Sequence, residues 1–321
     1  MLFDKIRYNK GTLFETEWLS LKQIIPSYYP LFSCIADRCQ HSCCIGWEIG
    51  IDDVAAARYR AVEGPFGERL RASMTEAEDG WQFLPDEHER CPFLNGQGLC
   101  DLILTLGEEA LCDICDAHPR FRYDYADRTE WGLGLCCEAA AALILSQEEP
   151  VTFSDDGTLP PDPDEAAMLR LRANAIAVAQ DRSISVAERE ERLLRSVGGR
   201  TPTAPEELAE WYLPLERLDP AWETELNRLQ TVTPAPSTVS DAASEQLLVY
   251  FLYRQIPPSL EDGCFKERMA FAVLSLRLIR ALAAVSNNTL FELARMYSAE
   301  IEYSDENIAC LLTKLARYAA A

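Results

Sequence analysis

The chain has 321 residues, 48% of them hydrophobic, and its 30 basic and 52 acidic side chains give a formal net charge of −22. The length predicts about two domains, and the apolar fraction is enough for sizeable cores. Such an acidic chain is a poor match for nucleic acid, which needs basic surface, but its field would attract lysine-rich protein partners. The same charge is equally compatible with a role in solubility alone.

The sequence contains no apolar run of about 18 residues, so we expect no membrane-spanning segment. The first 20 residues carry scattered charges without an apolar centre, which argues against a secretory signal. We therefore expect a cytoplasmic protein, in which thiols stay reduced and serve as metal ligands or redox groups rather than as disulfides.

In the first half of the chain, the sequence pattern predicts short helices and strands. Asp52 is placed to cap a helix over residues 52–62, which Gly64 and Pro65 would end. Thr75 and Glu78 resemble a capping box, although no long apolar run follows them. The other elements expected here are a short strand near 82–84, a strand or helix at 99–106, a helix at 108–115 that His118-Pro119 ends, a β-hairpin over 121–135 and a helix at 138–147.

Residues 150–164 are rich in Pro, Asp and Gly, which marks a linker. We therefore expect a cysteine-rich domain at 1–150 and an α-helical domain at 151–321. The second domain should hold helices at 164–182, 241–256, 264–285 and 288–300, two more after capping boxes at Ser185/Glu188 and Thr203/Glu206, and a last one from about Ser304. The predicted fold class is mainly α, with an α+β cysteine-rich unit containing the hairpin ahead of the helices.

Ten of the twelve cysteines lie between Cys34 and Cys137, at positions 34, 39, 43, 44, 91, 100, 112, 115, 136 and 137. Thiolates gathered in this way usually hold zinc or an iron–sulfur cluster. The spacing matches neither a Cys2His2 finger nor the bacterial ferredoxin run, and there are more thiols than a single four-ligand site needs. Two centres, or one centre plus structural thiols, are both possible. Cys264 and Cys310 stand apart in predicted helices, where we expect them in the core.

Three segments carry a resemblance to a known family. They are FSCIADRCQHSCCIGWEIGID at 32–52, CPFLNGQGLCDLILTLGEEALCDICDAHPRF at 91–121 and LGLCCEAAAALIL at 133–145. In order and rough spacing they resemble the flagellin lysine N-methylases, part of a wider group of CxxCxxCC iron- or zinc-chelating proteins. The resemblance covers about Tyr29 to Leu145, and the helical half shows no match of its own.

The resemblance implies transfer of a methyl group from S-adenosylmethionine to lysine ε-amines of flagellin. It also implies an iron–sulfur cluster of the [4Fe-4S] type, with zinc as the alternative. The sequence lacks the glycine-rich strand-to-helix turn of dinucleotide-binding folds, so S-adenosylmethionine would bind on another scaffold. The metal ligands implied are Cys39, Cys43, Cys44, Cys91, Cys100, Cys112 and Cys115, followed by Cys34 and Cys136. Cys137 stands where the family tends to have proline, and it receives no ligand role.

Methyl transfer to lysine requires acceptors that hold and deprotonate an ammonium. Asp113, Asp116, Tyr123 and Glu138 lie beside the cysteines and are the candidates, each with a plain surface or packing role as its alternative. Arg120 is the candidate for the carboxylate of S-adenosylmethionine, because a guanidinium fork suits carboxylates.

Four further side chains near the cysteines have open roles. His41 is the best non-cysteine ligand candidate, and His118 could bind metal, move a proton or make hydrogen bonds in its turn. Trp47 is expected to pack over the cluster, and Asp52 to act as a helix cap rather than a base. Two other protein classes fit the same thiols: a zinc-stapled structural protein whose helical half binds a partner, and a cluster-bearing oxidoreductase that uses the Cys112–Cys115 pair.

Overall fold

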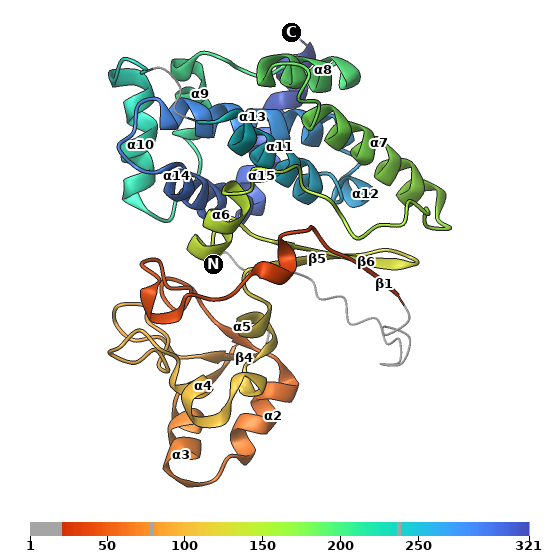
Figure 1. Cartoon of the computed structure of the whole chain (residues 1–321). Helices are drawn as coiled ribbons and strands as arrows, with labels where there is room; N and C mark the ends of the chain where they lie inside the picture. The colour runs from red at the N-terminus through yellow and green to blue at the C-terminus, as the bar shows by residue number, and fades with distance from the viewer. Residues whose placement is uncertain (1–20, 78–79, 236–238, 321) are drawn as a thin grey trace.

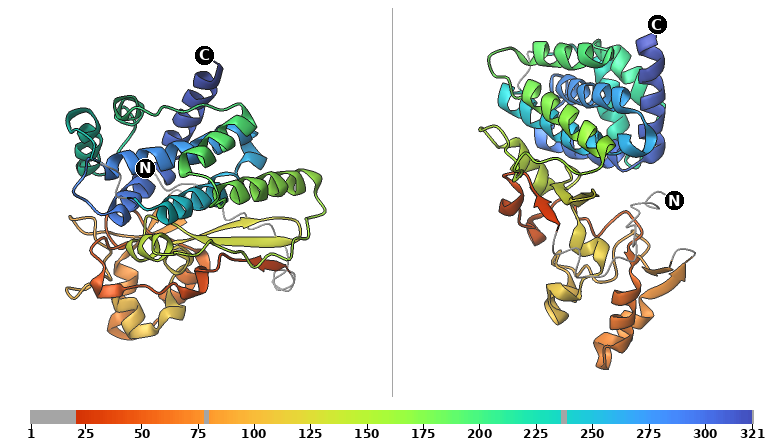
Figure 2. Two further views of the ribbon diagram at one scale, coloured as in Figure 1. Left: turned by 45° about the horizontal axis from the view of Figure 1, so that its top comes forward. Right: turned by 90° about the vertical axis from the view of Figure 1, so that its right-hand side faces the viewer.

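The computed structural model describes residues 21–77, 80–235 and 239–320. Helices of the carboxyl-terminal half lie at the top of Figure 1 and the cysteine-rich segment at the bottom. Between them lies a sheet made of β1 (Lys22–Ile24), β5 (Arg120–Asp124) and β6 (Arg128–Leu133). The right-hand view of Figure 2 shows the same three levels. The mainly α fold class is confirmed, and no helix in the described ranges is long and apolar enough to cross a membrane.

The cysteine-rich segment is built around a second small sheet. Its strands β2 (Gly50–Ile51), β4 (Gly80–Phe83) and β3 (Met74–Ala77) pair antiparallel in that order. The helices of this segment are α2 (Asp53–Ala61), α3 (Gly64–Ala72), α4 (Asp101–Leu106) and α5 (Asp113–Ala117), with 3₁₀ turns at Tyr29–Leu31, Ala36–Arg38 and Glu108–Ala110.

Asp52 caps α2 as predicted, because its Oδ1 accepts a hydrogen bond from the N–H of Ala55 at 2.9 Å. Helix α2 ends just before Gly64 and Pro65, as predicted, but the pair also opens α3, which was not predicted and in which proline occupies the first turn. A proline suits the start of a helix because its missing N–H would have no partner there. The capping box at Thr75 was wrong: Thr75 lies in strand β3, and Glu78 lies outside the described residues.

The predicted hairpin is confirmed. Strands β5 and β6 pair antiparallel with Arg120 opposite Leu133 and Asp124 opposite Thr129, and β1 adds a parallel strand to the other edge of β6. Helix α6 (Glu138–Leu145) follows at once, which also agrees with prediction. The hairpin therefore joins the last cysteines directly to the helical half.

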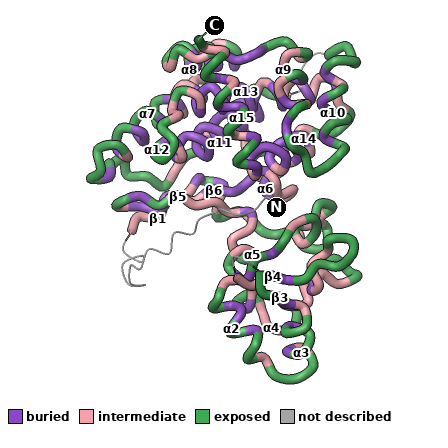
Figure 3. The backbone as a smooth tube through the Cα atoms, turned by 180° about the vertical axis from the view of Figure 1, so that it is seen from behind, coloured by how far each residue is buried: buried purple, intermediate pink, exposed green. Residues whose placement is uncertain are grey.

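Two long helices form the centre of the helical half. These are α11 (Asp241–Gln255), buried on nearly every side, and α13 (Phe265–Ala283). Buried backbone concentrates in these two helices in Figure 3. Around them lie α7 (Pro163–Ala179), α8 (Val186–Val197), α9 (Pro205–Tyr212), α10 (Pro220–Thr231), α12 (Ser259–Asp262), α14 (Leu290–Tyr297) and α15 (Asp305–Ala320).

Most of the helices predicted here are confirmed, with three differences. Thr203 does not cap α9, whose N-cap position is Ala204 without a side-chain hydrogen bond. The helix expected to run to residue 300 changes at Ser298 into a π-helical segment, Ser298–Glu302. The prediction that Cys264 and Cys310 lie in the core was wrong, because Cys310 is exposed and Cys264 is only partly buried.

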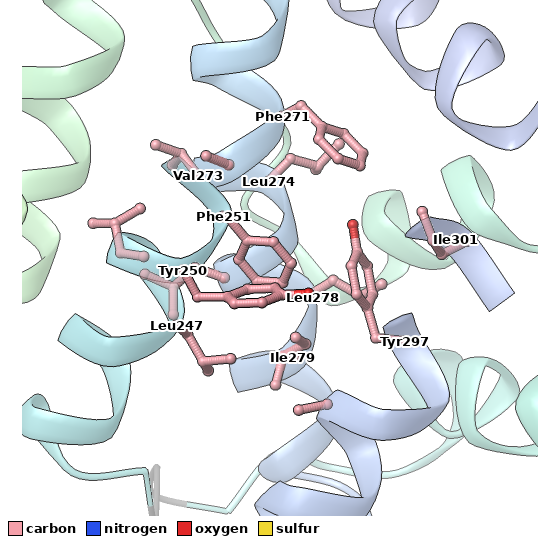
Figure 4. Packing of buried hydrophobic residues seen from close by; sticks show 14 of the residues in the cluster. Leu247, Tyr250, Phe251, Phe271, Val273, Leu274, Leu278, Ile279, Tyr297 and Ile301 are labelled. Atoms are coloured by element: carbon pink, nitrogen blue, oxygen red, sulfur yellow. The ribbon is translucent and has the colours of Figure 1, made fainter. Parts of the chain in front are cut away.

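The buried residues form two hydrophobic clusters of very different size. The small cluster lies within residues 49–112 and includes Tyr59, Leu70 and Phe93. The large one unites the helical half with Tyr28, Leu133 and helix α6. Figure 4 shows its centre, where the ring of Phe251 lies 5.1 Å from that of Tyr250 and 5.4 Å from that of Tyr297. The predicted domain boundary near residue 150 remains a prediction, and apolar packing joins the hairpin and α6 to the helices that follow.

Candidate metal centre

Backbone pairing brings three cysteines from two segments to one place. The N–H of Cys91 donates to the carbonyl of Cys44 at 2.8 Å, and Ile45 and Arg90 form a β-bridge beside them. A second bridge, between Leu94 and Cys100, closes the loop that carries Cys91 and Cys100. The segment around Cys44 therefore lies against the Cys91–Cys100 loop.

Helix α2 holds the Cys112–Cys115 pair in position. The Oδ2 of Asp52 accepts from the N–H of Asp113 at 2.9 Å, while the hydroxyl of Tyr59 donates to the carbonyl of Ala110 at 2.7 Å. Cys112 is the buried N-cap residue of α5, and Cys115 follows one turn later. One capping aspartate thus anchors both α2 and the CxxC helix.

These segments make up the first thiol group, called here the Cys44 group: Cys44, Cys91, Cys100, Cys112 and Cys115. Its members are close enough for their charges to interact. Burial, with smaller contributions from the charges of Cys44 and Cys100, raises the pKa of Cys91 to about 12. Cys112 and Cys115 share a hydrogen bond that lowers the pKa of Cys112 and raises that of Cys115. Buried thiols that resist ionising alone are suited to bind a cation that neutralises them.

Four of the five remaining clustered thiols form the Cys137 group: Cys34, Cys39, Cys43 and Cys137. Its loop is fixed to the start of α6, where the Oε2 of Glu138 accepts from the N–H of Gln40 at 2.8 Å and lies 3.7 Å from the Sγ of Cys39. Burial raises the pKa of Cys39 to about 11, with smaller contributions from Glu138 and Cys137. The hydrogen bond to Cys44 and burial raise the pKa of Cys43, and the charges of Cys34 and Cys137 make smaller contributions in the same direction.

The two groups meet at the adjacent residues Cys43 and Cys44. Their thiols share a hydrogen bond, which lowers the pKa of Cys44 to about 7 and raises that of Cys43. Arg90 and the hydroxyl of Ser42 also favour the Cys44 thiolate. The two thiol groups are therefore in direct contact at Cys43 and Cys44.

Within the described residues, no set of three or more His, Cys, Asp or Glu side chains is already arranged to hold a metal ion. The donor chemistry nevertheless fits a thiophilic centre, since each group contains at least four free thiols and thiolates bind zinc and iron–sulfur clusters. Binding would draw the sulfurs together, because metal sites commonly form only as the metal binds.

Three residues predicted beside the thiols have other contacts. Cys136 is directed into the helical half, where it interacts with Tyr303 and Arg254 and burial raises its pKa to about 11. The Nε2 of His41 lies 3.1 Å from the Oε2 of Glu292 on α14. Trp47 packs against the small cluster and donates its indole N–H to the carbonyl of Cys43 at 2.6 Å.

Arg120 and His118 lie where α5 runs into β5. One guanidinium nitrogen of Arg120 donates to the carbonyl of Asp116 at 3.1 Å, and the group lies 5.4 Å from the ring centre of Phe32. Burial, with a smaller contribution from the charge of Arg120, lowers the pKa of His118 to about 4. The histidine is therefore neutral at physiological pH.

The four candidate acceptors for lysine lie in different surroundings. Asp113 and Asp116 are exposed on α5 beside the CxxC thiols, and Glu138 lies in the first turn of α6 beside Cys39. Tyr123 instead packs against the helices, with its hydroxyl donating to the carbonyl of Arg254 at 2.7 Å. Burial raises its pKa to about 12.

Sequence reasoning missed three residues at the thiols. Tyr59 lies close enough to Cys112 and Cys115 for their charges to raise its pKa, although burial is the larger cause. Arg90 lies beside Cys44, and Cys137 lies with Cys34 and Cys43. Tyr59 is seven residues after the cap Asp52, on the buried face of the predicted helix, so helical periodicity could have identified it. Nothing local distinguishes Cys137 from Cys136.

The fold and the thiols define a mainly helical protein with a cysteine-rich unit whose thiols are all free. The chain is distantly similar to curated lysine-N-methylases: 28% identical over 142 residues to that of Salmonella choleraesuis, and 26% over 136 residues to that of Salmonella typhimurium. Each similarity covers 40% of this chain and 34% of the relative, so the chain matches about a third of their length. The flagellar biosynthetic protein FliU of Salmonella muenchen is 26% identical over 136 residues, covering 40% of this chain and 80% of that protein. No family model and no solved structure matches.

Proposed function

We propose that the chain is an S-adenosylmethionine-dependent protein-lysine N-methyltransferase of the cytoplasm, that it acts on flagellin, and that it carries an iron–sulfur cluster. The observation that carries the proposal is the partial similarity to two lysine-N-methylases and a flagellar protein. The gathering of thiols in the cysteine-rich unit supports the cluster, because cysteine thiolates are its usual ligands.

The Cys44 group is the proposed cluster site. It supplies five thiols from three segments that backbone hydrogen bonds and the Asp52 cap hold together. Cys44 is close enough to Cys91, Cys100 and Cys115 for their charges to interact, and Cys91 is likewise close to Cys100 and Cys115. A bound cluster would supply compensating positive charge and join the three segments.

The exposed carboxylates on α5 would receive the substrate. A lysine is an ammonium in water, so Asp113 or Asp116 would hold it and accept its proton before reaction. The neutral nitrogen then forms a bond to the methyl carbon as the carbon–sulfur bond breaks. S-adenosylmethionine would supply that methyl group and leave as S-adenosylhomocysteine. The net charge of −22 favours approach of a lysine-bearing surface.

Arg120 is the proposed contact for the methionine carboxylate of S-adenosylmethionine. Its hydrogen bond to the carbonyl of Asp116 uses one of the five N–H donors of a guanidinium, and the side chain is half-buried. This contact holds the guanidinium beside the end of α5, near the proposed lysine acceptors. We expect Arg120→Lys to raise the KM for S-adenosylmethionine more than it lowers kcat, because it loses bidentate binding.

The test is methyl transfer by iron-replete protein prepared without oxygen. The protein is mixed with flagellin and S-adenosylmethionine carrying a labelled methyl group, and the label on flagellin lysines is measured by mass spectrometry. Flagellin with acetylated lysines and the Cys91→Ala variant are the controls. Absence of label on flagellin under these conditions would sink the proposal.

A metal analysis separates the proposal from its alternative. Iron and inorganic sulfide in stoichiometric amounts, with the brown colour of a cluster, would support the methyltransferase. Stoichiometric zinc without sulfide, together with no methyl transfer, would favour the zinc-stapled structural protein whose helical half binds a partner.

A further inference from the structure

We propose that Glu302 is a positioning residue for the methyl transfer. Together with Tyr250 and Arg254, it fixes the end of the hairpin and, through it, strand β5, which begins with Arg120. The inference rests on the proposed function for the role of Arg120 as the contact for S-adenosylmethionine. Its local structural effect does not depend on that role, so it can be measured in a protein that transfers no methyl group.

Glu302 is a buried carboxylate at the centre of a polar network in the helical half. Its Oε2 accepts a hydrogen bond from the hydroxyl of Tyr250 at 2.8 Å, and its Oε1 accepts one from the side-chain amide of Gln255 at 2.8 Å. The Nε of Arg254 lies 3.4 Å from the same Oε1. Three side chains from the last turns of α11 therefore converge on one carboxylate, which belongs to the π-helical segment Ser298–Glu302.

The same side of α11 holds the hairpin and the residues that follow it. The hydroxyl of Tyr250 accepts a hydrogen bond from the N–H of Leu135 at 3.2 Å, just after β6. The carbonyl of Arg254 accepts one from the hydroxyl of Tyr123 at 2.7 Å, and its guanidinium lies 4.9 Å from the ring centre of Phe121. The network therefore contacts β5 through two side chains and the end of the hairpin through the backbone.

A backbone contact connects this network with Arg120. The N–H of Gly134 donates to the carbonyl of Pro119 at 2.7 Å, and Pro119 directly precedes Arg120. Gly134 lies against the network, because a Cβ atom there would be 2.9 Å from a guanidinium nitrogen of Arg254. Arg120 thus lies between two held neighbours, Pro119 and Phe121. A displacement of the network should displace Arg120, and a misplacement of about 1 Å can cost about 100-fold in rate.

Stability alone is a weak explanation for a carboxylate at this position. Buried ion pairs lose hydration energy, and apolar side chains of similar volume often stabilise a protein equally well. Glu302 also ends a π-helical segment, and such segments are rare and frequently lie at functional sites. Both observations favour a polar group that sets the position of the strand it contacts.

The test compares Glu302→Gln with a matched control, Glu245→Gln. Glu245 is another buried carboxylate, and it accepts hydrogen bonds from Arg182 at 2.9 Å and from Arg189 at 3.2 Å. It lies in the first turns of α11, at the opposite end from Arg254. Each variant loses a buried ion pair, so thermal unfolding should show comparable losses of stability. Only Glu302→Gln should alter the hairpin.

The first measurement is hydrogen exchange of the folded variants, which requires no activity. Tyr250→Phe is a milder second variant, because it removes only the hydroxyl that joins Glu302 to Leu135. We expect amide hydrogens of residues 120–124 and 132–136 to exchange about tenfold faster in both variants, and at an unchanged rate in Glu245→Gln. Equal exchange in Glu302→Gln and Glu245→Gln, whether fast or slow, overturns the proposal.

The second measurement is the kinetics of methyl transfer to flagellin. We expect Glu302→Gln and Tyr250→Phe to raise the KM for S-adenosylmethionine about tenfold, with a smaller change in kcat. Glu245→Gln should leave the KM unchanged. A purely structural role would lower the fraction of active protein, and hence kcat, without altering the KM. An unchanged KM in Glu302→Gln therefore also overturns the positioning role.

The two proposals fail in different ways. A protein that methylates no flagellin, but in which only Glu302→Gln and Tyr250→Phe exchange faster, loses the proposed activity and keeps the positioning of β5 by Glu302. A protein that methylates flagellin with the same KM in Glu302→Gln as in the unaltered chain keeps the activity and loses the positioning role.

Discussion

At the residue scale, His118 couples the cysteine-rich unit to pH. Its pKa is about 4 in the folded chain, against 6.5 for a free histidine, because burial and Arg120 disfavour the charged form. Between these values the unfolded chain binds a proton that the folded chain does not, so stability falls as pH drops below 6.5 and is fully present above it. When the pH falls from 7.5 to 5, we expect protonation of His118 in the unfolded chain to lower the free energy of unfolding by about 2 kcal/mol.

The measurement is urea unfolding of the metal-saturated protein at both pH values, for the unaltered chain and for His118→Gln. The variant should lose less stability on acidification, by about the same 2 kcal/mol. His88→Gln is the matched control, because that side chain is 75% exposed. Equal pH dependence of the unaltered chain and His118→Gln would contradict the assignment.

The cysteine pattern shows how far single residues can be interpreted from sequence. Clustering predicted a thiol-rich site, and the structure gathers those thiols in two neighbourhoods. Assignment of each thiol could not be predicted, because it depends on which distant segment each neighbour meets. Cys136 and Cys137 are identical in type and adjacent, yet one contacts Tyr303 and the other the first cysteine loop.

At the scale of elements, one buried ion pair connects the hairpin to helix α7. The guanidinium of Arg172 binds Glu130 through two hydrogen bonds of 2.7 and 2.5 Å, and lies 4.9 Å from the ring centre of Tyr253. Both charged side chains are almost fully buried. We expect Arg172→Met to lower the unfolding free energy by about 3–5 kcal/mol, because it leaves the carboxylate of Glu130 buried without its partner.

Urea unfolding of two further variants tests the cause. The double variant Arg172→Met/Glu130→Met should be more stable than Arg172→Met alone, since it removes the stranded charge. Arg192→Met should cost less than about 1 kcal/mol, because its pair with Glu188 is exposed. An Arg172→Met variant as stable as Arg192→Met would show that the buried pair does not hold the hairpin to α7.

A glycine lies where the end of the hairpin closely approaches side chains of the helical half. A Cβ atom at Gly134 would lie 2.5 Å from the hydroxyl of Tyr303 and 2.9 Å from a guanidinium nitrogen of Arg254. We expect Gly134→Ala to lower the unfolding free energy by about 1–3 kcal/mol through this overpacking, measured by thermal unfolding.

Two variants control for the effect of the methyl group itself. Gly50→Ala should change stability by less than about 1 kcal/mol, because no atom lies within 4 Å of its added Cβ. Adding Tyr303→Phe to Gly134→Ala should recover part of the loss by removing the closest atom. If the two alanine variants behave alike, the approach at Gly134 is looser than the structure shows.

Local sequence signals predicted an element correctly where the signal is compatible with only one local structure. The cap at Asp52, the hairpin over 121–135 and the Ser185 cap were all confirmed. The start of α3 at Gly64-Pro65 was not predicted, because such a pair can both end one helix and begin the next. Only tertiary packing decides whether a second helix follows. Strand β1 was not predicted, since its place depends on a partner strand about a hundred residues away.

At the scale of the whole molecule, the two hydrophobic clusters differ greatly in how much they can stabilise the parts of the chain that they belong to. The small cluster contains a dozen buried residues, and three of them are alanines. The large cluster unites α11 and α13 with the hairpin and α6. A small core rarely stabilises a domain without a metal or disulfides, and every described cysteine here is a free thiol. The cysteine-rich unit should therefore depend on the proposed metal for its stability, whereas the helical half should not.

Metal removal tests this dependence directly. After chelation under reducing conditions, we expect amide hydrogens of α2, α4 and α5 to exchange much faster, because binding free energy in such sites is also folding free energy. Those of α11 and α13 should keep their protection, since the large cluster encloses them. Hydrogen-exchange mass spectrometry of the metal-loaded and chelated protein measures both regions at once, with α8 as an internal reference far from the thiols. Unchanged protection of α5 would mean that the small cluster folds unaided, and equal loss in α11 would mean that the whole chain unfolds as one unit.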